Sequence, residues 1–152
     1  MARMMAARVD RRAARLRRAE GLRSPPGGRR TVGMSEAEHE PVEVRAPEGA
    51  RLMEIDWSDG TTSLLPHRVL RAFCPCAVCQ GHAGPVRWVE GTDALPPEAF
   101  ELKELGLSGQ YALRMGWGDG HATGIYRFAY LRDLGGLREL DDDTLKGTTF
   151  GR

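Results

Sequence analysis

All three cysteines of the chain lie in one short stretch, Phe73-Cys74-Pro75-Cys76-Ala77-Val78-Cys79-Gln80-Gly81. Cys74 and Cys76 are two positions apart and Pro75 fixes the backbone between them, so a disulfide joining these two cysteines would be strained. Three thiolates on one loop favour a cation site, because a shared divalent metal removes their repulsion and holds the loop. Three buried thiols that act as small apolar side chains are the alternative, but packing does not require this spacing.

Length and composition indicate a single globular domain in a reducing compartment. The chain has 152 residues, 41% of them hydrophobic, and a mean hydropathy of −0.43. No apolar run approaches the roughly 20 residues of a membrane span. The cysteine count is odd and the cysteines are adjacent, which argues against a disulfide framework and for reduced thiolates held by metal. We therefore expect a cytoplasmic protein without a membrane partner.

The net charge of +1 conceals two parts of opposite sign. Residues 1–33 contain ten arginines against Asp10 and Glu20, which gives 10 − 2 = +8, so the remainder carries 1 − 8 = −7. An acidic remainder predicts no basic face of the kind that nucleic-acid binding requires.

The Arg-rich arm, residues 1–33, alternates Ala and Arg and is consistent with a helix that ends at Gly21. Its functional interpretations are a nucleic-acid arm, an amphipathic helix on a membrane surface, or an organellar transit peptide. The alternative is an extension without fixed structure, or an artefact of gene-start assignment with translation beginning at Met34. We favour this alternative, because the arm lacks an apolar face that would tie it to a core.

The first ordered elements are expected to be a hairpin and a short helix. Residues 34–49 are acidic and contain proline, so they are predicted to be a flexible lead-in, with order beginning near Ala50. Apolar and acidic residues alternate over 53–57, as in a half-buried strand, and Ser58-Asp59-Gly60 supplies the turn to a return strand over 61–65. Residues 66–71 are then predicted to be one or two helical turns that lead into the cysteines.

Later elements follow from the same patterns. A short strand is expected at 86–89 and a clear strand over 111–117, whereas 100–107 is ambiguous between strand and helix. Near-helical spacing of apolar residues predicts a helix over 123–134, ended by the two glycines that follow it. Residues from Leu137 onward are predicted to be a solvated acidic tail.

The turns Trp57-Ser58-Asp59-Gly60 and Trp117-Gly118-Asp119-Gly120 share the pattern Trp-x-Asp-Gly at the ends of two predicted strands. Both Trp side chains are expected to point inward. The alternative is coincidence, because Trp suits strands and Asp-Gly suits turns. No longer repeat is evident in the sequence.

A closed tetrahedral zinc site needs a fourth ligand beside the three thiolates. The candidates are His39, His67, His82 and His121. His82 would complete Cys-x-Cys-x-x-Cys-x-x-His on one loop. His121 follows a confident strand in a tight turn, where a fixed backbone can aim an imidazole and tie two distant segments together. His39 lies in the flexible lead-in, where a histidine is more often an ordinary surface residue.

Three ordered motifs carry a resemblance to a known family. They are Met-Glu-Ile-Asp-Trp-Ser-Asp-Gly at 53–60, Leu-Arg at 70–71 before Cys-Pro-Cys-Ala-Val-Cys at 74–79, and Trp-Gly-Asp-Gly-His at 117–121 before Gly-Ile-Tyr at 124–126 and Leu-Arg at 131–132. In this order they resemble the gamma-butyrobetaine hydroxylase-like N-terminal domain. The resemblance implies a small α+β domain with a mainly antiparallel sheet, short helices and one zinc ion. The ligands implied are Cys74, Cys76, Cys79 and His121, which favours His121 over His82.

The resemblance divides the chain into an arm and lead-in (1–49), a zinc-binding domain (50–134) and an acidic tail (135–152). It brings no catalytic centre. In carnitine-biosynthesis hydroxylases such a domain precedes a 2-oxoglutarate and iron oxygenase domain, and similar domains are joined to P-loop ATPases of the iron–sulfur carrier type. Neither a P-loop nor a His-x-Asp/Glu iron motif is present here, so we expect no enzyme activity.

Two functions remain from the sequence. The first is a noncatalytic domain with structural zinc that serves as an interaction or accessory module for a protein partner, an oxygenase or an iron–sulfur assembly protein. The second is an iron or iron–sulfur binding or transfer protein that uses the Cys-x-Cys-x-x-Cys loop. We favour the first, because four protein ligands close a site, whereas transfer needs an open position. A nucleophilic Cys79 is disfavoured, since three clustered thiols suit a metal better than a catalytic pair.

Overall fold

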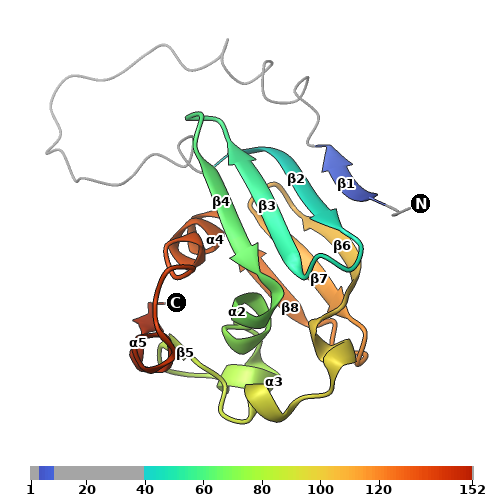
Figure 1. Cartoon of the computed structure of the whole chain (residues 1–152). Helices are drawn as coiled ribbons and strands as arrows, with labels where there is room; N and C mark the ends of the chain where they lie inside the picture. The colour runs from blue at the N-terminus through green and yellow to red at the C-terminus, as the bar shows by residue number, and fades with distance from the viewer. Residues whose placement is uncertain (1–3, 9–39, 152) are drawn as a thin grey trace, which may run out of the picture.

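The computed structural model describes residues 4–8 and 40–151. Within these residues, runs of strands are followed by short helices (Figure 1). The elements are β1 (Met4–Arg8), β2 (Pro41–Pro47), β3 (Leu52–Trp57), β4 (Thr62–Pro66), α2 (His67–Ala72), α3 (Ala77–Gln80), β5 (Val86–Arg87), η2 (Thr92–Ala94), η3 (Pro97–Phe100), β6 (Leu102–Ser108), β7 (Ala112–Trp117), β8 (Gly124–Arg127), α4 (Phe128–Gly135), α5 (Asp142–Gly147) and β9 (Thr149–Phe150).

The strands form antiparallel sheets with the orders β1-β2-β3-β4, β6-β7-β8 and β5-β9. The α+β prediction is confirmed, although the strands divide among separate sheets. Alternation of buried and partly exposed residues along β3 shows why this segment forms a strand with one face on the core. Gly60, at φ 86°, provides the left-handed conformation that the β3–β4 turn requires.

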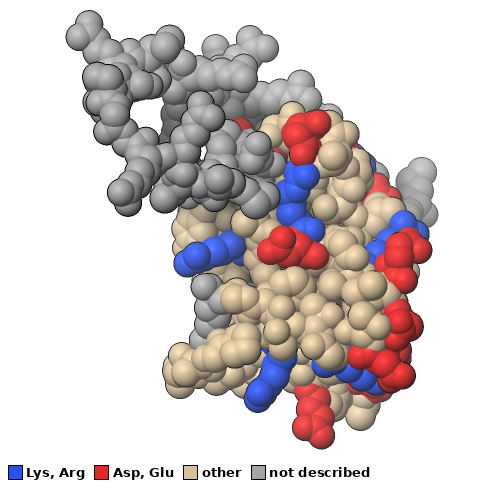
Figure 2. All heavy atoms as spheres, turned by 90° about the vertical axis from the view of Figure 1, so that its left-hand side faces the viewer, with Lys and Arg blue, Asp and Glu red and all other residues tan. Residues whose placement is uncertain are grey.

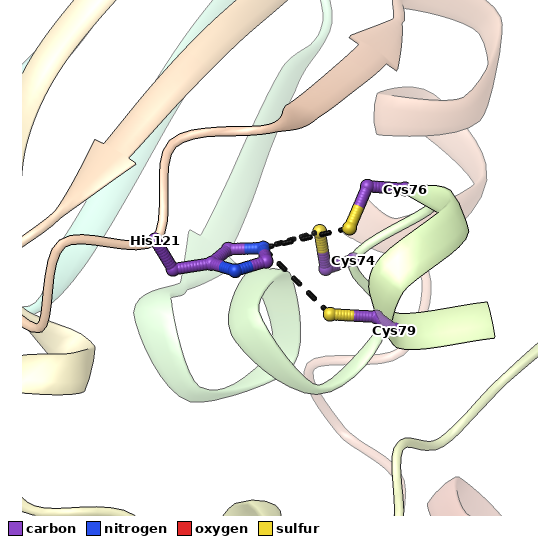
Figure 3. Close-up of side chains that lie close together, drawn as sticks. All are labelled: Cys74, Cys76, Cys79 and His121. Atoms are coloured by element: carbon purple, nitrogen blue, oxygen red, sulfur yellow. Dashed lines mark hydrogen bonds between the residues drawn. The ribbon is translucent and has the colours of Figure 1, made fainter. Parts of the chain in front are cut away.

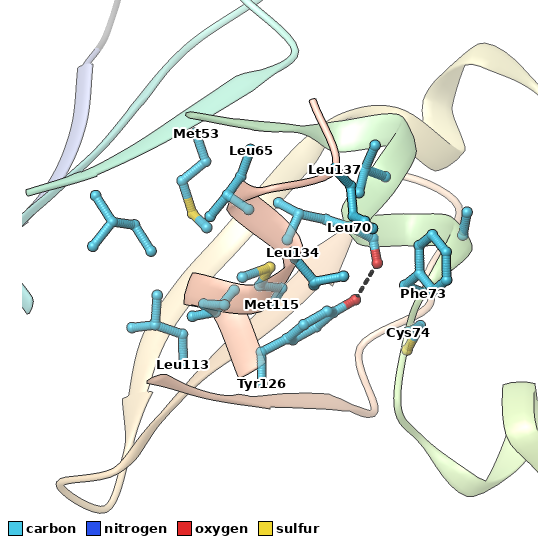
Figure 4. Packing of buried hydrophobic residues seen from close by; sticks show 14 of the residues in the cluster. Met53, Leu65, Leu70, Phe73, Cys74, Leu113, Met115, Tyr126, Leu134 and Leu137 are labelled. Carbon is cyan, nitrogen blue, oxygen red and sulfur yellow. Dashed lines mark hydrogen bonds between the residues drawn. The ribbon is translucent and has the colours of Figure 1, made fainter. Parts of the chain in front are cut away.

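One hydrophobic core joins the two larger sheets to the helices. Met53 and Leu65 from the first sheet and Met115 from the second lie in the same cluster as Leu70 of α2 and Leu134 of α4 (Figure 4). All five side chains are fully buried. The core therefore fixes both sheets and both helices relative to one another.

The resemblance between the two Trp-x-Asp-Gly turns extends much further in the structure than the sequence indicates. A first unit, β2-β3-β4-α2, and a second unit, β6-β7-β8-α4, have the same order of elements. In each unit the turn Trp faces the first strand just before a register shift, Pro41 opposite Trp57 and Leu102 opposite Trp117. The repeated sequence is confined to the turns, whereas the repeated order of elements covers both units, and both Trp side chains are buried, as expected.

The two units exchange charged partners. Asp59 in the turn of the first unit forms an ion pair with Arg132 in α4 of the second unit, at 2.7 Å. Asp119 in the turn of the second unit forms an ion pair with Arg71 in α2 of the first unit, at 2.9 Å. Each helix therefore satisfies the turn carboxylate of the other unit.

Order extends further toward the N-terminus than predicted. Residues 41–47 lie within the predicted flexible lead-in but form β2, which pairs with β3 and buries Val44 and Ala46. Alternation of apolar and charged residues in Val42-Glu43-Val44-Arg45-Ala46 explains the strand. Residues 4–8 of the arm form β1 along the other edge of β2. The predicted helix and the alternative interpretations of the arm otherwise fall on residues 9–33, outside the described part of the chain.

Residues 123–134 begin as a strand, contrary to the helix prediction. Gly124–Arg127 pair with β7, and the helix α4 starts only at Phe128 after Arg127 takes an extended conformation. The ambiguous segment 100–107 is largely strand β6, which pairs along β7.

The predicted solvated tail is also wrong. Leu137 and Leu145 are buried, and β9 pairs with β5. Asp141 caps α5, because its carboxylate accepts the N–H of Thr144 at 2.9 Å. The three consecutive aspartates therefore start the helix α5, and Leu145 of this helix packs against the core.

On the face in Figure 2, the acidic and basic side chains of the described residues are interspersed with uncharged surface and form no broad basic patch. Among the described residues, none of the helices combines the length and the apolar composition needed to cross a bilayer.

Candidate metal centre

The cysteine loop begins where α2 ends. The N–H of Phe73 donates to the carbonyl of Val69, after which the chain turns into Cys74-Pro75-Cys76. The carbonyl of Cys76 then accepts the N–H groups of Cys79 and Gln80, at 3.1 and 3.0 Å. The single turn α3 thereby brings Cys76 and Cys79 to one side of the loop.

Gln80 is a residue that sequence reasoning missed. Its buried amide donates to the carbonyl of Cys74 at 3.0 Å and to the carbonyl of Arg87 at 2.8 Å, and its oxygen accepts the N–H of Arg87 at 3.1 Å. These hydrogen bonds join the cysteine loop to β5. A buried, fully bonded amide of this kind fixes the backbone of Cys74 before any ion is bound.

His121 comes from the turn between β7 and β8. Gly120 has φ 87°, and the N–H of Trp117 donates to the carbonyl of His121 at 2.8 Å. The carboxylate of Asp119 accepts the N–H of His121 at 3.1 Å. The backbone of this turn therefore has a defined geometry, as predicted for a residue that aims an imidazole.

The four predicted donors converge on one point (Figure 3). The Nε2 atom of His121 lies 3.3 Å from the Sγ of Cys74, 3.6 Å from that of Cys76 and 3.7 Å from that of Cys79. All four donor atoms are within 4.8 Å of one another. One ring N–H cannot point at three sulfur atoms at once, so hydrogen bonding alone does not account for this arrangement.

The separations fit a tetrahedral ion. With bonds of about 2.3 Å to sulfur and about 2.0 Å to nitrogen, tetrahedral zinc places a thiolate and an imidazole nitrogen about 3.5 Å apart. The three distances from His121 Nε2, between 3.3 and 3.7 Å, bracket that value. The donor set therefore fits zinc in both chemistry and spacing.

Burial shifts the pKa values of three of the four ligands, whereas the pKa of Cys76 is lowered by hydrogen bonds that outweigh its burial. Burial raises the pKa of the Cys74 thiol to about 12 and also raises the pKa of Cys79, because a thiolate is poorly solvated there. Burial lowers the pKa of His121, so its imidazole is neutral and has a lone pair to donate. A cation would displace thiol protons on binding, so its affinity depends on pH.

The other two histidines in the described part of the chain lie away from this group. His82 is exposed on the loop and is not part of the four-donor group. His67 is buried at the start of α2, where its Nδ1 is 2.9 Å from the carbonyl of Phe100 and its ring lies edge-on to Trp117. His39 lies outside the described residues.

The absence of a side chain at Gly124 leaves space for the sulfur of Cys74. A Cβ at this position would lie 3.0 Å from the Sγ of Cys74 and 2.8 Å from Cε2 of Tyr126. Both neighbours are fully buried, and the hydroxyl of Tyr126 donates to the carbonyl of Leu70 at 2.7 Å, so neither can move away freely.

Gly124→Ala is therefore expected to destabilise the protein by about 1–3 kcal/mol through overpacking and to weaken any binding of a metal ion by the four donors. The measurements are chemical denaturation and zinc competition against a chromogenic chelator. Gly106→Ala in β6 is the matched control, because a Cβ there meets nothing within 4 Å. Equal effects of the two substitutions would contradict the packing argument.

The fold and the site define a small α+β domain whose Cys3His group can hold a metal ion. The family model for the gamma-butyrobetaine hydroxylase-like, N-terminal domain matches residues 44–132, more than half of the chain. The chain belongs to this family.

Solved structures agree with this assignment. The crystal structure of a protein of unknown function of the DUF971 family from Acidithiobacillus ferrooxidans, at 1.93 Å resolution, is 36% identical, with a TM-score of 0.51. The match covers 66% of this chain and 98% of that chain. A protein structure solved by NMR in solution is 23% identical over 73% of this chain and 77% of its own, with a TM-score of 0.53, and shows the shared fold.

Proposed function

We propose that Cys74, Cys76, Cys79 and His121 bind one zinc ion whose role is structural. The observation that carries the proposal is the convergence of three sulfur atoms on one imidazole nitrogen at tetrahedral spacing. When bound, zinc supplies a cross-link between the loop after α2 and the turn after β7. Four protein donors complete the tetrahedron, so the site has no position for a substrate, and we infer a noncatalytic domain.

The donor set supports a single zinc ion over the alternative iron–sulfur function. Thiolates and imidazole are ligands that zinc shares with other soft or borderline metals, and a tetrahedral arrangement favours zinc. An iron–sulfur cluster binds its ligands through different iron atoms, which places the donors further apart. Donors that all lie within 4.8 Å of one another support a mononuclear site.

The proposed role of the domain is that of an accessory module for a protein partner in the cytoplasm. The family takes its description from a hydroxylase-like protein, so an oxygenase is one candidate partner, and an iron–sulfur assembly protein is the other. The tip of the cysteine loop supports a contact role, because Ala77 is exposed and Val78 is 80% exposed. Apolar side chains on a metal-stiffened loop lose little entropy when a partner covers them.

Metal analysis of the full chain, purified without added metal, tests the zinc proposal. We expect colourless protein with about one zinc per chain by elemental analysis. Brown protein with sulfide-linked absorption would instead establish the iron–sulfur function. Substitution of zinc by Co²⁺ should give the strong visible bands of a tetrahedral thiolate site, and weak octahedral bands would contradict the closed geometry.

A further inference from the structure

We propose that Arg71 is the positioning residue of the metal centre, because its guanidinium links the sulfur of Cys79 to the carboxylate that orients His121. This inference rests on the proposed zinc site. It assigns to the Leu70-Arg71 pair, beyond the four ligands, a defined part in holding the ion.

Arg71 is almost completely buried, at 7% exposure, although it carries a permanent charge. Its Nη2 lies 2.9 Å from Oδ2 of Asp119, and its Nη1 lies 3.8 Å from the Sγ of Cys79. A buried cation is stable only with anionic partners in good geometry. One of the partners of Arg71 is itself a proposed zinc ligand.

The second partner connects Arg71 to the backbone of His121. Asp119 uses Oδ2 for Arg71 and Oδ1 for the N–H of His121, at 3.1 Å. A continuous chain of contacts therefore runs from Cys79 through Arg71 and Asp119 to His121. It joins a ligand of α3 to a ligand of the turn between β7 and β8.

The positive charge of Arg71 complements the net charge of the occupied metal site. Three thiolates, a neutral imidazole and a divalent ion carry a net charge of 3 × (−1) + 2 = −1 when bound. The guanidinium beside Cys79 stabilises the thiolate form of that ligand and offsets charge at the sulfur. Lysine would not reproduce the link, because a planar guanidinium reaches the carboxylate and the sulfur from two fixed nitrogens.

The second Arg–Asp pair supplies a built-in comparison. Arg132 bonds Oδ2 of Asp59 at 2.7 Å, and Oδ1 of Asp59 accepts the N–H of Thr61 at 2.9 Å, which repeats the geometry of the first pair. Arg132 lies over the ring of Trp57, at 5.2 Å, whereas Arg71 reaches a cysteine. The two pairs thus share the turn contact and differ in what else the guanidinium contacts.

The experiment compares Arg71→Gln with Arg132→Gln in the full chain. Unfolding is measured by chemical denaturation, zinc release by transfer to a chromogenic chelator, and ligand geometry by the Co²⁺ absorption spectrum. We expect both variants to be less stable, but only Arg71→Gln to release zinc faster, by about tenfold or more, and to shift the sulfur-to-cobalt charge-transfer band. Arg71→Lys is expected to recover part of the stability and not the slow release.

Equal release rates and unchanged spectra in the two Gln variants would overturn the proposal and leave Arg71 a purely structural residue. If Arg71→Gln does not fold, Asp119→Asn tests the proposal instead. The amide oxygen of the new side chain still accepts the His121 N–H, but the charge that pairs with Arg71 is lost. Asp119→Asn should also release zinc faster, and wild-type release would overturn the proposal. A wild-type chain that binds no zinc would refute the proposed function itself, an outcome distinct from these.

Discussion

Replacement of His121 by Ala is expected to release zinc and to unfold or strongly destabilise the protein. Binding free energies of structural zinc sites are about 10–16 kcal/mol in zinc-finger peptides, comparable with the 5–15 kcal/mol net stability of a whole domain. The proposed ion would join the loop after α2 to the turn after β7, so losing one ligand would leave three thiols without this cross-link. Zinc content by elemental analysis and circular dichroism through a thermal scan measure both effects.

His82→Ala is the control for this prediction. His82 is exposed on the same loop as the cysteines and should be replaced without loss of zinc or stability. Ala substitutions at Cys74, Cys76 and Cys79 should each resemble His121→Ala, as equal members of one tetrahedral site. Loss of metal in His82→Ala with retention in His121→Ala would show that the loop binds metal alone and that the ligand assignment is wrong.

Removal of the chain from Asp141 onward is expected to have the second-largest effect. Leu145 is 4% exposed, and the ring of Phe150 packs edge-on against Phe73 and Tyr130, at centroid distances of 5.5 and 5.4 Å. Full burial of a Leu side chain contributes about 1.5–3 kcal/mol and the partly buried Phe150 adds less, so the truncation should cost roughly 2–5 kcal/mol. Phe73 directly precedes Cys74, so zinc should also be released faster.

A matched pair of point variants separates this effect from simple shortening. Leu145→Ala should lower the denaturation midpoint, whereas Leu140→Ala, at a position 37% exposed, should have little effect. Urea denaturation followed by tryptophan fluorescence is a suitable measurement, because Trp88 packs against Phe73. An unchanged midpoint in the truncated protein would show that these residues add nothing to the core.

The sequence predicts the parts of the site that are local. Cysteine spacing identifies the loop, and period-two alternation locates β3 and β7 with the turn that carries His121. Spacing alone did not separate His82 from His121, because the decision depends on a contact between residues 42–47 positions apart in the chain. The family resemblance favoured His121, and the structure brings that residue to the cysteines.

Other features need the folded chain. Leu137, Leu145 and Phe150 are too widely spaced to form a periodic pattern, so tertiary burial alone makes the tail part of the core. The strand β8 was missed because Ile125 and Phe128 fit a helical period as well as a strand followed by a helix.

The structural repeat of the two units cannot be recognised from the sequence. Outside the shared turn and the Leu-Arg pair, corresponding positions differ, and Thr61 stands in one turn where His121 stands in the other. The structural equivalence lies in backbone hydrogen bonds and strand register, which different side chains can support.

The two Arg–Asp ion pairs between the units affect how the protein unfolds. Partial unfolding of either unit would withdraw its guanidinium from the other and leave a turn carboxylate without its charged partner. Opening of one unit is therefore penalised in both, and intermediates with one unit intact should be scarce. We therefore expect the two similar units to unfold as one cooperative system, with a single denaturation transition rather than two.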